Sequence, residues 1–549
     1  MLEIVGPPDE GLRGLLLKCL AVVMIASAVK FIHRLCQVRM MVRRAQNQPG
    51  VFALPHSFVL GHLPAITKVA IKLKMPRDAH GQSMPLLIAQ AYPEVMKAGC
   101  VYMDVWPLSN PMIAVFHPDL MAQFTQENSQ LKHPNMKAEF GPFTGANDLA
   151  CSDGREWRAD RAIFNPGFSA RNLLSLIPAF VEEVIVFRDY LIKSAQQGTT
   201  VNMVDLTTNL TVDIIARAVL GARVHAQDRP VKFITSMLDQ VGLLYFDIQF
   251  SKALNPLRPL RHFVLNRAFR QEMMPYVQNV VQNYEKMEGP KTILNLAVKS
   301  YVEEVQEIST RGHIPPEFLD KVVNHVKMFL FAGHDTTATT VAYAYFALYS
   351  HPEKLALLRA EHDAVFGADL SQTAERIAAN PSLLNQLPYT LAVVKETLRL
   401  WPVVGTVRIG EPGFSLRHPD TGVEYPAEGF MLFGCSAAVQ RNPYFWPEPD
   451  AFIPERWTVR DESDPLRPVK NAFRPWEQGP RNCIGQELAS LELRLILALT
   501  VREFDMAAVY PEKAETFLGT KAYQVQPPAC ITAHPKDGLP MRVSIRKTG

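Results

Sequence analysis

A cysteine loop near the C-terminus constrains the fold of this chain more than any other feature of its sequence. Cys483 lies between Gly479 and Gly485, with Arg481 two residues before it and Trp476 at the start of the loop. The residues that follow have the apolar periodicity of a helix, so the cysteine stands at a predicted helix N-terminus. The helix dipole and the neighbouring arginine both favour an anionic sulfur at this position. The sequence therefore predicts a thiolate in a tight, glycine-bracketed loop.

Such a thiolate suits the axial position of haem iron. Glycine allows the backbone to approach a flat ligand closely, and backbone N–H groups in the loop can donate to the sulfur and adjust its electron donation. A single buried cysteine is more often a small apolar side chain, so the spacing around Cys483 carries the interpretation. The chain has seven scattered cysteines and no Cys-x-x-Cys pair. Neither a disulfide scaffold nor a zinc ribbon is supported.

A second motif lies inside a long predicted helix from Pro316 to Tyr349. It contains Gly333, Asp335 and Thr336, although glycine costs a helix interior about 1 kcal/mol relative to alanine. A threonine hydroxyl can bond the carbonyl one turn back and open the helix. We expect the opened backbone to leave room for dioxygen, with Thr336 as proton donor and Asp335 as its neighbouring acid. A kinked core helix with satisfied hydroxyls is the alternative.

A third motif predicts a buried ionic network. Glu396 and Arg399 are three residues apart on one predicted helix face, and Arg456 follows in a proline-rich stretch. Apolar residues surround the pair, although a Glu-x-x-Arg pair is usually exposed and contributes little. A buried glutamate between two arginines would brace the region behind the cysteine loop.

These motifs, in this order, resemble the cytochrome P-450 superfamily, whose cysteine loop normally opens with Phe where this chain has Trp476. The resemblance runs from about residue 50 to Val543. It implies a mainly α fold with a minor β portion, in which a long central helix lies over haem beside a small β-rich subdomain. It implies haem b with Cys483 as the iron ligand, Gly333 clearing space over the macrocycle, and a structural role for Glu396, Arg399 and Arg456.

The resemblance also implies further haem and substrate contacts. Trp157, Arg161 and Arg408 are expected near the propionates, with Arg155 and Arg158 as nearby alternatives and His133 as a weaker candidate. Arg481 is expected at the haem beside Cys483, whereas His334 is interpreted as structural. Substrate would be shaped by apolar segments, which are the loop from Lys132 to Cys151, Phe329 to Ala332, Val403 to Val407, and Tyr523 to Pro528. A hydrophobic small molecule is the expected substrate.

The implied activity is monooxygenation, in which one atom of O2 enters the substrate and the other leaves as water. The chain has no Gly-x-Gly-x-x-G fingerprint and no iron–sulfur cysteines, so electrons are expected from NADPH-cytochrome P-450 reductase, with cytochrome b5 as an additional donor. The cysteine loop and residues Phe331 to Thr340 are similar to fungal members that tailor polyketides, terpenoids or alkaloids, including mycotoxins. An isomerase or dehydratase of the same fold and a non-catalytic haem-binding membrane protein are the alternatives.

The N-terminus predicts a membrane anchor. Residues 12–32 form an apolar run of 21 residues, roughly 31 Å as a helix and enough to span a bilayer core. Lys18 interrupts the run, and basic residues follow it, which places the body on the cytosolic face. A signal peptide cleaved near Ala26-Ser27-Ala28 and an interfacial helix are the alternatives. The expected location is the endoplasmic reticulum membrane, crossed once.

The resulting domain organisation is a short lumenal N-terminus (1–11), the anchor (12–32), a basic juxtamembrane segment with a Pro/Gly hinge (33–64) and a haem-thiolate catalytic domain (65–549). Helices are predicted at 173–191, 207–220, 316–349 and 486–499, and strands at 101–106, 112–116, 430–433 and 541–545. The net charge of +3 gives no indication of a nucleic-acid partner.

Overall fold

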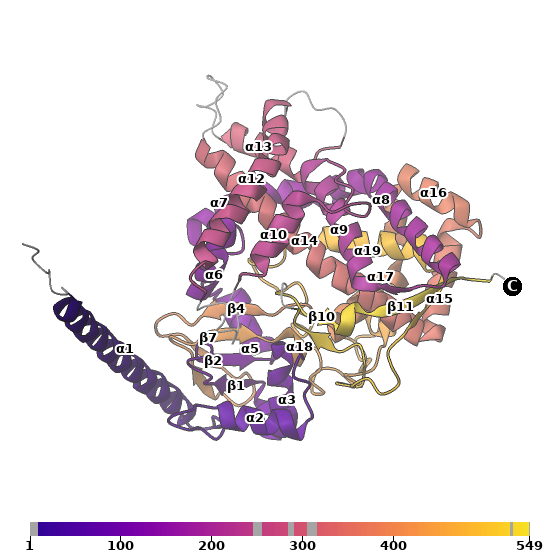
Figure 1. Ribbon diagram of the computed structural model, residues 1–549. Coiled ribbons are helices and arrows are strands. Elements are labelled where there is room, and N and C mark those ends of the chain that lie inside the picture. The colour runs from indigo at the N-terminus through magenta and orange to yellow at the C-terminus, as the bar shows by residue number, and fades with distance from the viewer. Residues whose placement is uncertain (1–8, 245–254, 284–289, 305–315, 528–530, 548–549) are drawn as a thin grey trace, which may run out of the picture.

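The computed structural model describes residues 9–244, 255–283, 290–304, 316–527 and 531–547 (Figure 1). The helices are α1 (Asp9–Gln46), α2 (Leu63–Lys72), α3 (Met84–Ala91), α4 (Pro93–Ala98), α5 (Pro118–Ala122), α6 (Pro134–Thr144), α7 (Gly154–Phe164), α8 (Ala170–Gln197), α9 (Met203–Leu220), α10 (Lys232–Val241), α12 (Arg258–Asn283), α13 (Ile293–Glu304), α14 (Pro316–Ser350), α15 (Pro352–Phe366), α16 (Thr373–Ala379), α17 (Pro388–Leu400), α18 (Ser436–Val439) and α19 (Gln486–Thr500).

The strands are short and form four small sheets. They are β1 (Cys100–Met103), β2 (Met112–Val115), β3 (Thr200–Asn202), β4 (Thr406–Ile409), β5 (Ser415–Arg417), β6 (Glu424–Pro426), β7 (Met431–Gly434), β8 (Phe504–Ala508), β9 (Gln524–Val525), β10 (His534–Pro535) and β11 (Pro540–Ile545). The main sheet has the order β1-β2-β7-β4, in which β2 and β7 are parallel and the other pairs are antiparallel. The remaining sheets are β3-β11-β8, β9-β10 and β5-β6.

Two hydrophobic cores divide the molecule into a large helical body and a smaller β-rich subdomain. The helical core is built from α8, α9, α14, α17 and α19, with α14 packed along α9. The second core lies around the main sheet and includes residues of α1, α3 and α5. In Figure 1 the main sheet lies in the lower part of the view and the helical body lies above it. The expected mainly α fold with a small β-rich subdomain is confirmed.

The predicted secondary structure is confirmed in type and differs at some ends. The helix predicted to end at Gly221 does end there, with this glycine at a φ of +69° that L side chains rarely adopt. The first predicted strand was expected to reach Trp106, but β1 ends at Met103. Here the backbone N–H of Asp104 donates to the ring of His62, and its C=O accepts from the N–H of His62, at 2.8 Å each. These bonds replace strand pairing.

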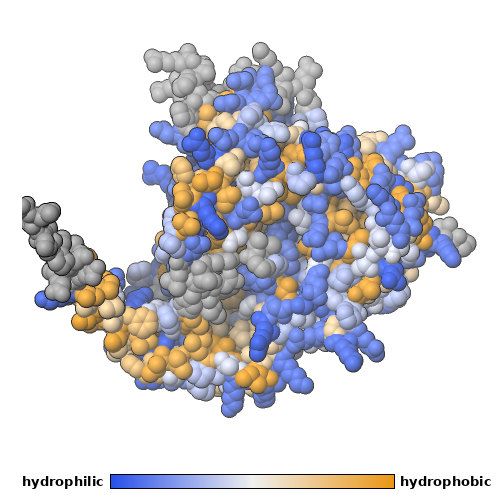
Figure 2. All heavy atoms as spheres, in the orientation of Figure 1, coloured by the Kyte–Doolittle hydropathy of each residue, from blue (hydrophilic) through white to orange (hydrophobic). Residues whose placement is uncertain are grey.

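The first helix is longer than the predicted anchor. α1 extends away from the body (Figure 1), and its large apolar side chains between Leu15 and Ile32 are exposed. Figure 2 shows apolar residues along its length. Within the described part of the chain, α1 is the helix whose length and composition suit a membrane span.

The first part of the basic segment expected to follow the anchor is helical and fixed to the body. Helix α1 continues to Gln46 and ends before Pro49, and Val38 and Val42 are buried in the β-rich core. Arg39 is fully buried and forms an ion pair with Asp104. Its guanidinium also donates to the Trp106 carbonyl at 2.8 Å. Because its polar groups are satisfied on the body, this half of α1 is anchored to the catalytic domain.

Candidate active site

The cysteine loop adopts the predicted tight turn at the start of α19. The N–H of Cys483 donates to the Trp476 carbonyl at 2.8 Å, and the N–H of Asn482 donates to the Gly479 carbonyl at 3.2 Å. Gly479 has a φ of +85°, and a Cβ there would lie 2.2 Å from the Thr125 carbonyl oxygen. Since no real Cβ approaches an oxygen so closely, the backbone conformation and the packing both require glycine at this position.

The thiol of Cys483 is accessible although the protein surrounds it. Burial raises the pKa of this thiol, while the backbone N–H groups of Gly485 and Gln486 and the positive charge of Arg161 act in the opposite direction. By contrast, Cys100, Cys151 and Cys435 are buried in the fold. Cys530, the seventh cysteine, lies outside the described residues. The loop therefore presents a sulfur atom with donors arranged around it, as a metal thiolate requires.

The central helix α14 has an accessible strip one turn long. Ala332 is exposed and Thr336 is partly exposed, whereas Phe331, Asp335 and Thr337 are buried. The Thr336 hydroxyl donates to the Ala332 carbonyl at 2.8 Å, which is the predicted bond to the preceding turn. The strip thus combines a hydroxyl and a small side chain in a part of the helix whose other side chains are mostly buried.

Gly333 has a neighbour that the sequence did not indicate. A Cβ at this position would lie 2.7 Å from Cδ1 of Ile215 on α9. The glycine therefore allows α14 and α9 to pack closely, and its missing side chain points to a helix and not to an open space. The resemblance implied a role over the macrocycle, and the geometry gives a different reason for this residue.

Asp335 takes part in a buried network with the C-terminal segment. Its carboxylate accepts from Nε2 of His534 at 2.7 Å and from the hydroxyl of Thr532. Burial alone would raise the pKa of Asp335, but the hydrogen bond and charge of His534 hold it below the ordinary value of 3.8. His534 and Thr532 were missed in the sequence, because they stand almost 200 residues from Asp335 and belong to no motif.

His334 and His133 have structural hydrogen bonds. Nδ1 of His334 is 2.7 Å from the Leu330 carbonyl, one turn back on α14. Nδ1 of His133 accepts from the N–H of Asn135 at 3.2 Å and caps α6. The structural interpretation of His334 agrees with this geometry, and His133 acts as a helix cap.

The arginines expected near the haem gather beside the cysteine loop. The Arg481 guanidinium lies over the Trp157 ring at 4.6 Å and donates to Asp153 at 2.6 Å. Arg161 donates to the carbonyl and side-chain oxygens of Asn482, at 2.8 and 3.1 Å. These bonds connect α7 and the preceding loop directly to the residue before Cys483.

Arg408 is the clearest sign of a missing anionic partner. It is fully buried, and its Nε and Nη2 have no acceptor among the described residues. Burial lowers the pKa of Lys132 well below its ordinary value, with smaller contributions from the charges of Arg408 and Arg481. The side chains of Lys132, Arg408 and Arg481 thus all lie near the carboxylate of Asp153. An anionic group such as a haem propionate would satisfy the free donors of Arg408. In the sequence, Lys132 was named only as the first residue of a loop expected to shape the substrate site.

The predicted ionic network is present behind the loop. The Glu396 carboxylate accepts from Arg399 at 2.8 and 2.9 Å and from Arg456 at 3.3 Å, and all three side chains are fully buried or nearly so. It also accepts from the Trp457 indole N–H at 3.0 Å and from the Ile453 backbone N–H at 3.0 Å. A single carboxylate therefore joins α17 to the segment around Pro454–Trp457.

The segments expected to shape the substrate site are mostly apolar, with one change in structure. The predicted loop after Lys132 contains the helix α6, in which Phe140 and Phe143 are buried. The ring of Phe143 lies 5.5 Å from that of Phe331 on α14, in an edge-to-face arrangement. Val403 is buried beside Ala533, whose N–H donates to its carbonyl at 3.0 Å. Pro528, at the end of the last segment, lies outside the described residues.

Comparisons with known proteins agree with this site. A family model described as Cytochrome P450 matches residues 88–531. The cytochrome P450 monooxygenase polC of Polytolypa hystricis is 35% identical over 540 residues, which cover 96% of this chain and 95% of polC. The cytochrome P450 monooxygenase acrF of Aspergillus aculeatus is 32% identical over 508 residues, 86% of this chain and 99% of acrF.

Solved structures support the same fold. The heme domain of cytochrome P450DA has a TM-score of 0.65 at 21% identity, and the match covers 90% of this chain and 97% of that domain. The crystal structure of the cytochrome P450 CYP102L1 has a TM-score of 0.67 at 19% identity, covering 86% of this chain and 96% of that structure. With a family model that matches most of its length and relatives above 30% identity along nearly the whole chain, this protein belongs to the cytochrome P450 family.

Proposed function

We propose that this chain is a membrane-anchored haem-thiolate monooxygenase that modifies a hydrophobic small molecule in fungal secondary metabolism, with Cys483 as the axial ligand. As a cytochrome P450 it is an oxidoreductase that uses haem, O2 and electrons from a redox partner. The observation that carries the assignment of the ligand is the accessible Cys483 thiol at the N-terminus of α19, with the N–H groups of Gly485 and Gln486 acting on its sulfur.

The residues present fit haem. Cys483 would hold the iron, and the buried Arg408, with free Nε and Nη2, would bind a propionate together with Lys132 and Arg481. The ring of Trp157, over which the Arg481 guanidinium lies, would hold this arginine in place. Haem bound here would supply dioxygen binding and reductive activation, so that one oxygen atom enters the substrate and the other leaves as water.

The protein's own contribution is proton delivery and exclusion of water. In our proposal Thr336 holds a proton at its Oγ1 on the accessible strip of α14, and Asp335 replenishes it from the buried network with His534 and Thr532. The aromatic side chains of Phe143 and Phe331 keep the surroundings apolar. The substrate would lie against this apolar surface.

The electron donor and the location follow from the anchor. The apolar first half of helix α1 would cross the membrane of the endoplasmic reticulum once, with the basic residues of its second half on the cytosolic side. The catalytic domain would then face NADPH-cytochrome P-450 reductase, with cytochrome b5 as an additional donor. The fungal monooxygenases among the relatives support the role in secondary metabolism.

The intact Asp335 and Thr336 argue against an isomerase or dehydratase of the same fold, which has no use for proton delivery to oxygen. The apolar segments around Phe143 argue against a protein that only binds haem. Turnover of substrate in the presence of reductase and NADPH separates monooxygenation from both alternatives.

The experiment is the reduced, carbon-monoxide difference spectrum of microsomes that contain the full chain. We expect a Soret band shifted far to the red, as an anionic sulfur ligand produces, and its loss in Cys483→Ala. The matched control is Cys36→Ala, which removes a half-buried thiol on α1. If Cys483→Ala keeps the red-shifted band, the ligand assignment is wrong. A histidine-type spectrum in the unmodified protein would exclude thiolate ligation and the proposed activity.

A further inference from the structure

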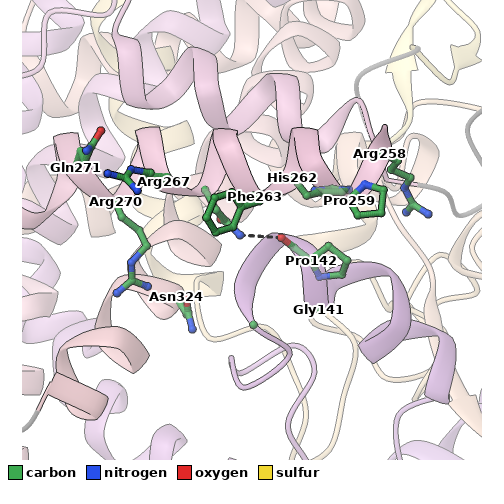
Figure 3. Close-up of a pocket in the computed structure, with 12 residues that line it drawn as sticks. Gly141, Pro142, Arg258, Pro259, His262, Phe263, Arg267, Arg270, Gln271 and Asn324 are labelled. Atoms are coloured by element: carbon green, nitrogen blue, oxygen red, sulfur yellow. Dashed lines mark hydrogen bonds between the residues drawn. The ribbon is translucent and has the colours of Figure 1, made fainter. Parts of the chain in front are cut away.

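A pocket of about 850 Å³ lies between α6 and α12, with one wall from α14. Figure 3 shows α12 along one side, where it contributes Arg258, His262 and Arg270, with Gly141 and Pro142 of α6 opposite. The dashed line in Figure 3 is the hydrogen bond from the Asn266 amide to the Pro142 carbonyl, 2.9 Å, which joins the two helices across the pocket. Neither the cysteine loop nor the accessible strip of α14 contributes to its lining.

Cationic side chains line this pocket, and its lining contains no acidic residue. The three arginines differ in how they are neutralised. Arg258 is paired with Glu139 at 2.8 Å, and Arg270 is paired with Asp320. Arg267 is exposed and has no ion-pair partner among the residues that the structure describes, so its charge is available to a ligand.

His262 is a buried donor in the same pocket without a partner. It is 4% exposed, and neither of its ring nitrogens has a hydrogen-bond partner in the described part of the protein. Burial, together with the charges of Arg258 and Lys327, lowers its pKa to about 4, so the ring is neutral and offers one N–H. A buried polar group left unpaired costs free energy. An acceptor bound in the pocket would remove this cost.

Apolar surface adjoins the charged part. Pro142, Pro259 and Phe263 belong to the lining, and Phe263 is 64% exposed. Leu260 and Val264 continue this apolar surface on the outside of α12, at 59% and 54% exposure. A ligand that satisfied the whole pocket would therefore have a negative head beside an apolar chain. A small inorganic anion would leave the apolar part uncovered.

A group of hydrogen bonds around Lys327 lies between the pocket and the rings of Phe143 and Phe331. The Lys327 ammonium donates to the Phe143 carbonyl at 2.8 Å and to Asn266 at 2.6 Å, and it also binds Gln240. These bonds connect α14 with α6, α10 and α12 beneath the pocket. Asp335 and Thr336, proposed for oxygen chemistry, are not part of the pocket lining, although α6 belongs to the segment expected to shape the substrate site. The inference therefore goes beyond the proposed function.

We propose that this pocket is a binding site for an amphiphilic anion, whose carboxylate or phosphate head is held by Arg267 and by the N–H of His262 while its apolar chain lies along Phe263 and Pro259. A charge-assisted hydrogen bond from arginine and a neutral one from histidine suit a head group with several acceptor oxygens. Both a free acid and an anionic lipid at the membrane surface carry this chemistry.

The test uses the full haem-containing chain in phosphatidylcholine nanodiscs and measures the dissociation constant of dodecanoate by calorimetry, with dodecanol as the uncharged probe of equal chain length. We expect dodecanoate to bind more tightly than dodecanol, and Arg267→Gln to weaken it about tenfold or more. The matched control is Arg261→Gln, an exposed arginine on the same helix that is outside the pocket lining. His262→Phe should also weaken the binding of dodecanoate. Equal affinity for the two probes, or unchanged affinity in Arg267→Gln, would overturn the proposal.

A second set of nanodiscs identifies the source of the head group. If phosphatidic acid added to the phosphatidylcholine competes with dodecanoate in the unmodified protein but not in Arg267→Gln, the natural ligand is an anionic lipid. If phosphatidic acid leaves dodecanoate binding unchanged while Arg267→Gln abolishes it, the pocket selects free acids. Competition that is the same with and without Arg267 would count against the site.

Discussion

Nε2 of His534 donates to the buried carboxylate of Asp335 at 2.7 Å, joining the C-terminal segment to the central helix α14. Thr532 donates to the second oxygen of the same carboxylate. Asp335 therefore depends on two residues from β10 and the turn before it to remain ionised inside the protein. This relationship makes the ionisation of Asp335, the acid in our proposal, depend on a segment that no sequence motif identifies.

Replacing His534 should impair proton delivery more than substrate binding. In His534→Ala the burial of Asp335 is no longer offset, so its pKa rises and the supply of protons to Thr336 changes. We expect more NADPH to be consumed per product and more peroxide to be released. The measurement is the ratio of product to NADPH with reductase present. His534→Gln retains a donor that cannot transfer a proton, and His225→Ala removes an exposed histidine as a control.

The acid stability of the same variant gives a second readout. Because the folded pKa of Asp335 is below 3.8, its contribution to the free energy of unfolding is present above the unfolded pKa and is lost as the pH falls through the folded value. In His534→Ala burial is no longer offset, so the folded pKa of Asp335 rises and this loss of stability on acidification should shrink or reverse in sign. Parallel acid denaturation curves for the variant and the unmodified protein would contradict the role of His534 in holding the carboxylate ionised.

The sequence could predict this site only where the signal was local. The cysteine loop, the Gly333–Thr336 segment and the pair Glu396 and Arg399 each lie within a few residues, so spacing predicted their geometry. His534, Thr532 and Lys132 reach the site through long-range packing, and no nearby residue marks them. The boundary of β1 could not be predicted for the same reason, since it is set by His62, 42 residues away from Asp104.

Replacing Gly333 should test whether the glycine serves the packing of two helices. In Gly333→Ala the new Cβ would lie 2.7 Å from Cδ1 of Ile215, and such overpacking costs about 1–3 kcal/mol. We expect a lower temperature midpoint for loss of the haem-thiolate absorbance. Ile215→Ala removes the clash, so Gly333→Ala should cost less stability in the Ile215→Ala background than in the unmodified protein. Gly81→Ala, where no atom lies within 4 Å of the new Cβ, is the control. A loss that Ile215→Ala does not reduce would show that Gly333 acts elsewhere.

Neutralising Glu396 should destabilise the region behind the cysteine loop. Glu396→Gln leaves the buried charges of Arg399 and Arg456 without their carboxylate. Breaking a buried ion pair in this way costs about 3–5 kcal/mol. The prediction is checked by urea unfolding of the holoenzyme, followed by circular dichroism and by haem release. Glu462→Gln is the matched control, because its pair with Arg467 is exposed and contributes up to about 1 kcal/mol. Similar effects of the two changes would contradict the bracing role of the network.

Lys327 should make stability depend on pH above neutrality. Burial, with a smaller effect from Arg270, lowers the pKa of Lys327 from 10.5 to about 7. The groups that face its ammonium are neutral, namely Gln240, Asn266, the Phe143 carbonyl and the rings of Phe143 and Phe269. Between these pKa values the unfolded chain binds a proton that the folded chain does not. This contribution to the free energy of unfolding therefore increases with pH, by at most about 1.4 kcal/mol per pH unit.

Lys327→Met removes the titrating amine and should flatten the dependence of the free energy of unfolding on pH. The change also leaves the acceptor oxygens of Gln240 and Asn266 without this donor. The measurement compares urea unfolding midpoints at about pH 7.5 and about pH 9, so that the cost of the lost hydrogen bonds, which is present at both values, does not enter. Lys193→Met on α8, which removes an exposed lysine, should retain the slope of the unmodified protein. If Lys327→Met also retains that slope, the prediction is wrong. The Lys327 ammonium is then charged in the folded protein at neutral pH, and it adds a full positive charge next to the pocket.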